Sequence, residues 1–226
     1  MHVQIDPAIL YFGTPVVLVS STNEDGSANL APISSAWWLG KSCLLGFGAS
    51  SKTPGNILRT GECVLNLPSV HQVGAVDRLA RLTGSNPIPP HKQAMGYCYE
   101  KEKFEVAGLT PRPSATVAAP RVLECPVQLE ATLAGCFRLA EGDPQRQGRL
   151  VALETRIERV HIDESLRLEG HSDRIDPVKW RPLIMSFCQF FGLGPIIYPS
   201  TLAQIPESAY RPPAPRQEAA AMKGAA

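Results

Sequence analysis

An excess of charge of either sign is missing from this 226-residue sequence, in which 22 Lys and Arg residues nearly cancel 21 Asp and Glu residues. Without a polybasic segment, the chain has no electrostatic footprint for nucleic acid or for an anionic membrane surface. Long hydrophobic runs are also missing, since none approaches the about 20 residues of a transmembrane helix. The N-terminus lacks the basic stretch and apolar core of a secretory signal. We therefore expect a cytoplasmic protein that binds neither nucleic acid nor membrane.

Residue patterns for metal binding and for nucleophilic catalysis are absent as well. The six cysteines are scattered, with no C-x-x-C pair and no Cys/His cluster at metal-ligand spacing. The five histidines have no Ser/His/Asp or Cys/His partner at a recognisable spacing. We predict no metal site and no catalytic side chain.

Hydrophobic residues make up 44% of the chain, and over its first two thirds they are arranged as short strands. β-Branched or alternating apolar runs predict strands at 15–20, 29–38, 42–48, 62–67, 121–139 and 149–162. The dipeptide Asp25-Gly26 predicts a tight turn between the first two. Because no β-helix-β alternation runs through the chain, an antiparallel barrel is favoured over a doubly wound sheet.

Two short helices are predicted between the strands. Thr53 as N-cap, Pro54 at the first helical position and Gly61 after the end define the first helix. Apolar residues spaced through 70–83 and followed by a glycine indicate the second, an amphipathic packing helix. The proline-containing segment 85–103 lacks periodicity and is predicted to be a long surface loop, a length that often accompanies function.

An anion site is predicted where the first helix begins. Hydroxyl groups, one ammonium and free backbone N–H groups gather there, in the sequence Ser50-Ser51-Lys52-Thr53. A phosphate monoester would suit these groups, although an ordinary capped surface helix accounts for them equally well. The Gly46-x-Gly48 pattern just before it is rejected as a dinucleotide fingerprint, because the third glycine and a parallel-strand unit are missing.

A second cluster precedes the anion site, next to Trp37 and Trp38. Small residues there allow a flat ligand to approach the backbone, and hydroxyl and N–H groups can bond the polar edge of a heteroaromatic ring. The cluster runs Asn29-Leu30-Ala31-Pro32-Ile33-Ser34-Ser35. A core strand with an irregular bulge is an equal alternative from this segment alone.

Together, the two clusters suit the phosphate and the ring of flavin mononucleotide (FMN). At this point the sequence resembles the flavin reductase-like, FMN-binding split-barrel family. The resemblance covers about residues 10 to 165, and it rests on the combination of several strings rather than on any one of them. These strings are Pro15-Val16-Val17, Asp25-Gly26, Asn29 to Ser35, Ser51-Lys52-Thr53-Pro54-x-Asn56, Thr60 to Asn66, Ala107 to Pro111 and Glu124 to Glu130.

The resemblance implies a fold, a cofactor and a reaction. The fold is mainly β with a few helices, a six-stranded Greek-key split β-barrel that works as a homodimer with FMN near the interface. NADH or NADPH is the co-substrate, and a hydride passes from the nicotinamide to flavin N5. Some members hand reduced flavin to a separate monooxygenase, so such a partner is also an expectation. The implied cofactor-binding residues are Asn29, Leu30, Ala31, Pro32, Ser34, Ser35, Ser50, Ser51, Lys52, Thr53 and Asn56.

Two other flavin functions stay open, and an extension beyond the barrel bears on them. One is a non-catalytic or electron-transferring FMN-binding protein, and the other is a split-barrel oxidoreductase with tightly bound FMN that acts on an organic substrate. We predict a split-barrel domain at 1–165 and an extension at 166–205 that packs on the barrel or on a dimer partner. A Pro/Ala-rich tail at 206–226 is predicted to be extended or disordered.

Overall fold

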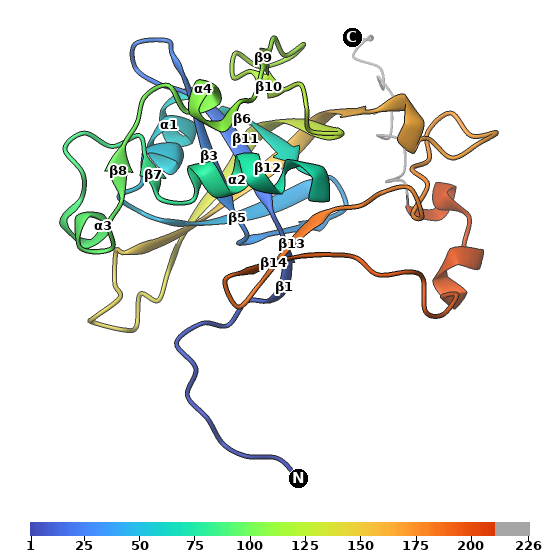
Figure 1. Cartoon of the computed structure of the whole chain (residues 1–226), viewed down its shortest axis with the longest axis horizontal. Coiled ribbons are helices and arrows are strands. Elements are labelled where there is room, and N and C mark those ends of the chain that lie inside the picture. The colour runs from blue at the N-terminus through green and yellow to red at the C-terminus, as the bar shows by residue number, and fades with distance from the viewer. Residues whose placement is uncertain (211–226) are drawn as a thin grey trace, which may run out of the picture. The chain divides into compact units, whose positions relative to one another are not determined.

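The computed structural model describes residues 1–210 of the chain. One unit ends at Pro195, and a second begins at Ile196. The first unit contains a seven-stranded antiparallel sheet in the order β3-β2-β6-β11-β12-β5-β4 (Figure 1). Its strands are β2 (Val17–Thr22), β3 (Ala28–Ile33), β4 (Ala36–Leu39), β5 (Ser42–Gly48), β6 (Glu62–Leu67), β11 (Val127–Leu139) and β12 (Leu150–Ile162).

Shorter elements connect and cover these strands. A second, three-stranded sheet is formed by β1 (Phe12–Pro15), β13 (Leu183–Ser186) and β14 (Gln189–Gly192). The remaining elements of the first unit are α1 (Lys52–Thr60), η1 (Val70–Gln72), α2 (Val73–Leu79), β7 (Leu82–Thr83), α3 (Pro90–Ala94), β8 (Cys98–Tyr99), α4 (Lys103–Ala107), β9 (Pro111–Arg112), β10 (Arg121–Val122) and η2 (Glu164–Leu166). The second unit contains η3 (Thr201–Gln204) and η4 (Glu207–Tyr210). No helix within residues 1–210 is long and apolar enough to cross a bilayer.

The large sheet curls into an incomplete barrel. Its two edge strands, β3 and β4, are consecutive in the chain, and only Ser34 and Ser35 separate them. A sheet whose edges are joined by so short a connection has to curve until the edges approach each other. In the described part of the chain, these edges form no ladder with each other. Ser35 already belongs to the β4 edge, because the Gly46 N–H of β5 donates to its carbonyl at 2.7 Å, and the barrel is split along the seam between β3 and β4.

Two hydrophobic cores pack against opposite faces of the sheet. The strand β2 contributes to both, because its side chains alternate between the faces. Val17 and Val19 belong to the core inside the barrel, whereas Leu18 belongs to the core outside it. Residues of α2 and α4 cover this outer core. Since side chains fill the barrel interior, a ligand has to bind at the surface or at the seam.

Several predicted elements are confirmed. The strands predicted at 42–48 and 62–67 are β5 and β6, and the Asp25-Gly26 turn lies in the β2–β3 hairpin. The first helix has its N-cap at Ser51 rather than at Thr53, although Gly61 ends it as predicted, with a left-handed φ of 75°.

Other elements differ from the prediction. The single strand predicted at 29–38 is interrupted at Ser34 and Ser35, because the Ser35 carbonyl bonds to Gly46 and the chain then pairs with β5. This interruption gives seven strands where six were predicted. The predicted helix 70–83 is shorter: α2 ends at Leu79, and the chain then turns to pair β7 with β8.

The chain was predicted to consist of a barrel, an extension and a tail, and the structure divides it into two units. The first unit ends at Pro195 and contains β13 and β14, which pair with β1. The boundaries predicted at 165 and 205 stay a prediction. Most of the predicted Pro/Ala-rich tail at 206–226 lies outside the described residues, which end at residue 210.

Candidate functional site

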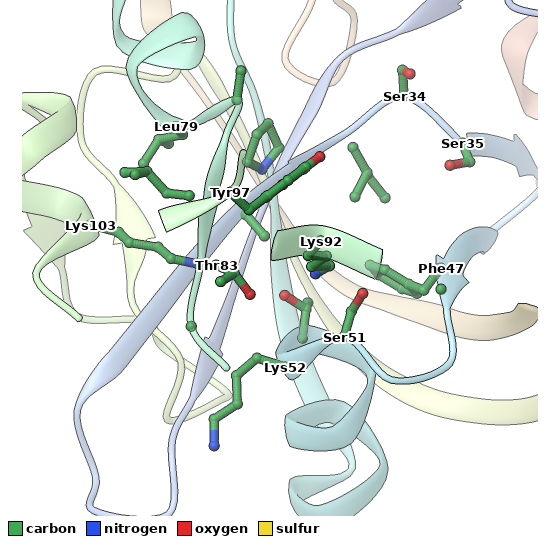
Figure 2. A pocket seen from close by; sticks show the side chains of 18 of the residues that line it. Ser34, Ser35, Phe47, Ser51, Lys52, Leu79, Thr83, Lys92, Tyr97 and Lys103 are labelled. Carbon is green, nitrogen blue, oxygen red and sulfur yellow. The ribbon is translucent and has the colours of Figure 1, made fainter. Parts of the chain in front are cut away.

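A pocket of about 340 Å³ lies at the seam of the barrel. Its walls come from the end of β3, the two serines after it, the end of β5, the start of α1, and the chain from α2 to α4 (Figure 2). Segments far apart in the sequence therefore share one cavity. A concave site of this size suits a small molecule or part of a cofactor.

One end of the pocket is suited to an anion. The helix α1 begins at Lys52, and its N-cap Ser51 makes no side-chain capping hydrogen bond. The first N–H groups of a helix have no acceptor within the helix and carry partial positive charge. Ser51, Lys52 and Thr53 all line the pocket at this point. The hydroxyls and the free N–H groups together suit a phosphate, whereas the Lys52 ammonium pairs with Glu24.

A buried hydrogen-bond network lies beneath the anion end of the pocket and fixes the position of Thr53. Asn29 Nδ2 donates to Thr53 Oγ1 at 3.1 Å and to Ser21 Oγ at 3.3 Å, while Asn29 Oδ1 accepts from Lys103 Nζ at 3.0 Å. Asn56 Nδ2 donates to the same Ser21 oxygen at 3.1 Å. Because Thr53 Oγ1 is the acceptor in this network, its own O–H can donate to a ligand in the pocket.

The other end of the pocket exposes backbone at close range. Ser34 and Ser35 line it at the interruption between β3 and β4. A Cβ atom added at Gly46 would lie 2.9 Å from Ser35 Cβ, and one added at Gly84 would lie 2.6 Å from Asn29 Oδ1. Only glycine allows these close contacts within the protein. Gly46 packs against Ser35 at this end of the pocket, whereas Gly84 packs against Asn29 at the anion end.

Lysines make the pocket electrostatically positive. Lys52, Lys92 and Lys103 line it, and among the residues described no Asp or Glu does. Lys52 pairs with Glu24 at 2.5 Å, whereas Lys103 is only 3% exposed and donates to the neutral Asn29. Burial lowers the pKa of Lys103 to about 8, and the charge of Lys92 contributes to the lowering. Burial also lowers the pKa of Lys92. An anionic ligand would offset this repulsion.

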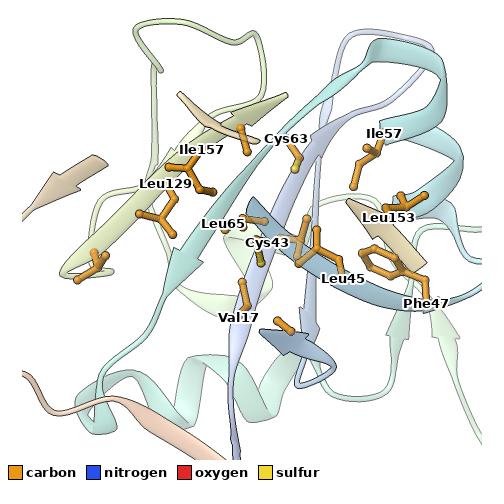
Figure 3. Close-up of a cluster of buried hydrophobic side chains, with 14 of the residues drawn as sticks. Val17, Cys43, Leu45, Phe47, Ile57, Cys63, Leu65, Leu129, Leu153 and Ile157 are labelled. Carbon is orange, nitrogen blue, oxygen red and sulfur yellow. The ribbon is translucent and has the colours of Figure 1, made fainter. Parts of the chain in front are cut away.

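Three aromatic rings line the pocket, from Tyr11, Phe47 and Tyr97, together with aliphatic side chains that include Leu79 and Leu82. Phe47 also belongs to the barrel core, and Figure 3 shows it at one end of the buried cluster. Its position is therefore fixed by packing. The tryptophans beside the predicted ring-edge cluster do not line the pocket: Trp37 is 53% exposed, and Trp38 packs against the barrel core. Both lie on β4, which turns away to pair with β5.

Most of the predicted cofactor-binding residues line this pocket, namely Ala31, Pro32, Ser34, Ser35, Ser51, Lys52 and Thr53. The other four do not. Asn29 and Asn56 are buried beneath the lining, and Ser50 is exposed outside it. Leu30 is fully buried in the outer core, because successive side chains of a strand point to opposite faces.

The two clusters predicted from the sequence lack several residues that complete the pocket, which are Thr83, Gly84, Lys92, Tyr97 and Lys103. All lie after residue 80, whereas the predicted clusters end at residue 56, and only the fold brings the two regions together. One sequence feature pointed to this second region, namely the length of the predicted loop 85–103. That segment contains α3 and β8 and carries Lys92 and Tyr97.

The fold and the pocket define a class of protein, a split β-barrel with a cationic pocket at its seam that suits a phosphate and a flat ring. Residues 9–189 match the flavin reductase like domain, and the chain belongs to this family. The predicted family and the mainly β split-barrel fold are thereby confirmed.

Known proteins resemble the chain over most of its length. The uncharacterized protein YdfE of Bacillus subtilis (strain 168) is 41% identical over 191 residues, which cover 84% of this chain and 89% of YdfE. Flavoredoxin of Desulfovibrio vulgaris (Miyazaki F) has a TM-score of 0.71 at 22% identity and covers 91% of this chain and 100% of its own. Nitrilotriacetate monooxygenase component B from Bacillus cereus has a TM-score of 0.68 at 21% identity, with coverage of 86% and 98%. At these identities the two solved structures support the fold alone.

Proposed function

We propose that this protein binds FMN in the seam pocket and reduces it with NADH or NADPH. One observation carries the proposal: a single pocket combines a helix N-terminus with hydroxyls at one end and the backbone and hydroxyls of Ser34 and Ser35 at the other. These two ends have the chemistry of the phosphate and the ring of FMN. Membership of the flavin reductase-like family supports flavin as the ligand.

The residues of the pocket fit the parts of this cofactor. Ser51, Thr53 and the first N–H groups of α1 would hold the phosphate, and the Lys52 ammonium would join them by exchanging its partner Glu24 for the phosphate. Ser34 and Ser35 would offer hydroxyl and backbone groups to the polar edge of the ring. When bound, FMN supplies a ring nitrogen that accepts a hydride, while the dihydronicotinamide that loses the hydride becomes a nicotinamide cation.

The protein contributes orientation and charge to this reaction rather than an acid or a nucleophile. Phe47 and the backbone at Ser34 and Ser35 would shape the space for flat groups, which brings two rings together in a fixed arrangement. The Lys103 ammonium is desolvated and held by Asn29, so it favours negative charge inside the pocket. No step requires a metal ion.

Anaerobic titration of the purified full chain tests the proposal. Added FMN is expected to bind, as measured by quenching of its fluorescence, and NADH or NADPH is expected to bleach the flavin absorbance. FMN binding without bleaching by either donor would favour the electron-transferring alternative. A protein that does not bind FMN would reject the proposal.

A double variant tests the assignment of the phosphate. Replacing Lys52 and Thr53 together by Ala is expected to weaken FMN binding by about tenfold or more, because charge-assisted bonds to the phosphate are lost. Riboflavin lacks the phosphate, so its affinity should change much less. Lys101→Ala serves as the control, since this lysine pairs with Asp25 outside the pocket. Equal losses for FMN and riboflavin would place the phosphate elsewhere.

We also propose that the protein is a cytoplasmic homodimer and that it supplies reduced flavin to a monooxygenase. Exposed aromatic side chains support self-association: Phe12 and Phe187 meet edge to face at 4.8 Å, yet both remain exposed. Sedimentation equilibrium tests the dimer, and a monomer at micromolar concentration would reject it.

Release of reduced FMN, followed as the dissociation rate of the reduced form, tests whether a separate enzyme can receive it.

A further inference from the structure

The side chain of Lys52 lines two cavities. One is the seam pocket, and the other is a cavity of about 280 Å³ that the turn between β2 and β3 forms with the chain around Tyr99. The stem of Lys52 packs against Gly84, where an added Cβ atom would lie 3.2 Å from Lys52 Cγ. Figure 2 shows the ammonium pointing away from the middle of the seam pocket. The stem is therefore held in place, while the ammonium lies at the edge of the pocket.

A carboxylate of the β2–β3 turn holds this ammonium. Lys52 Nζ lies 2.5 Å from Glu24 Oε2, and the hydrogen bond from the ammonium lowers the pKa of Glu24. The Glu24 side chain is 64% exposed and does not line the seam pocket. Ion pairs with so much exposure contribute little stability, so a phosphate that is also held by a helix N-terminus can replace the carboxylate.

The β2–β3 turn does not depend on Glu24 for its position. On one side, Asn56 Nδ2 of α1 donates to Asn23 Oδ1 at 2.9 Å. On the other side, Asp25 Oδ2 lies 2.8 Å from Lys101 Nζ, in the chain after β8. Glu24 takes part in neither contact, so its carboxylate can leave the ammonium while the turn stays in place.

We propose that Glu24 competes with the FMN phosphate for Lys52 and thereby lowers the affinity of the pocket for phosphorylated flavins. Without ligand, the ion pair balances the charge of Lys52. When FMN binds, the ammonium exchanges the carboxylate for the phosphate, and Glu24 stays in the second cavity, which Lys101 also lines. This inference rests on the proposed function and adds a residue outside the seam pocket. Glu24 is a positioning residue, because it acts through Lys52.

The variant Glu24→Gln removes the competing charge and keeps the size of the side chain. In fluorescence titrations of the full chain, its Kd for FMN should be about threefold lower than that of the wild type, in line with the loss of one exposed ion pair. The Kd for riboflavin should not change, because riboflavin has no phosphate. In the Lys52→Ala background, Glu24→Gln should change the Kd for FMN by less than about 1.5-fold, because the carboxylate then has no ammonium to occupy.

The variant Asp25→Asn is the matched control. It removes a charge from the same turn, but from a carboxylate that pairs with Lys101 instead of Lys52, so the Kd for FMN should change by less than about 1.5-fold. Unchanged or weaker FMN binding in Glu24→Gln would overturn the competition. An equal gain for riboflavin, in Asp25→Asn or in the Lys52→Ala background would also overturn it, by assigning the effect to the overall charge. A wild type that does not bind FMN would instead reject the proposed function, so the two failures are distinct.

Discussion

At the level of single residues, the pKa of Lys103 is expected to make the binding of an anionic ligand depend on pH. Burial lowers its pKa to about 8, with a contribution from the charge of Lys92. A bound anion favours the protonated ammonium and therefore raises this pKa. By linkage, the proposed binding of FMN is expected to take up a proton near pH 8 and to be tighter below that pH than above it.

We therefore expect the affinity for FMN to fall as the pH rises through about 8. Fluorescence titrations between about pH 7 and 9 measure this dependence. In Lys103→Met the slope should disappear, because the side chain no longer titrates. If the variant keeps the slope of the wild type, the proton belongs to another group.

The variant Gly84→Ala tests the close approach of the Gly84 backbone to Asn29 in the wall of the pocket. A Cβ atom at this position would lie 2.6 Å from Asn29 Oδ1 and 3.5 Å from Lys103 Nζ. Gly84→Ala must displace these groups, so we expect a stability loss of about 1–3 kcal/mol and weaker FMN binding. Urea unfolding and FMN titration measure the two effects. The same change at Gly55 serves as the control, because nothing lies within 4 Å there and alanine favours the helix.

At the level of elements, Glu130 of β11 ties a loop to the barrel. Its side chain is fully buried and accepts the N–H of Ala115 at 2.8 Å, the N–H of Thr116 at 2.6 Å and a bond from His161 Nε2 at 2.7 Å. Burial alone would raise the pKa of Glu130, but bonds from Thr116, Ala115 and His161 outweigh it and lower the pKa to about 2. The ionised carboxylate is thus the form that the fold requires.

Glu130 should make the protein sensitive to acid. Its pKa is 4.5 when unfolded and about 2 when folded, so its stabilisation is complete above pH 4.5 and is lost as the pH falls towards 2. This difference corresponds to about 3 kcal/mol. Glu130→Gln should lower the free energy of unfolding at pH 7 and flatten its dependence between these two pH values. Urea unfolding at several pH values checks this, with the exposed Glu164→Gln as a variant that should behave like the wild type.

Elements that depend on neighbouring residues could be predicted, and those that depend on distant ones could not. The alternation of apolar residues in β5 and β6 and the glycine that ends α1 are local signals, and each gave the right element. The interruption after β3 depends on a bond from the Gly46 N–H of β5 to the Ser35 carbonyl, which no local pattern encodes.

The same distinction holds for the site in the whole molecule. The residues of 31–35 and 51–53 could be predicted, because hydroxyls beside a helix start have a local meaning. Lys92, Tyr97 and Lys103 could not, since their place in the pocket depends on the pairing of β7 with β8 and on the packing of α4 against the outer core. The sequence therefore predicts the wall of the pocket formed by residues 31–35 and 51–53 and misses the wall formed by the chain after residue 80.

Leu183 tests whether the chain after the barrel strands folds as part of the same cooperative unit. It is 2% exposed in the outer core, and its carbonyl accepts the Val16 N–H at 2.9 Å beside β2. Leu183→Ala in the full chain should cost about 2–4 kcal/mol, because it leaves a cavity in a shared core. Leu193→Ala is the matched control, since this leucine is 52% exposed and should change stability by less than about 0.5 kcal/mol. Calorimetry should show one transition for residues 1–195 that moves to lower temperature in Leu183→Ala. A barrel transition that stays at its original temperature while a separate one shifts would mean that β13 and β14 fold independently of the barrel.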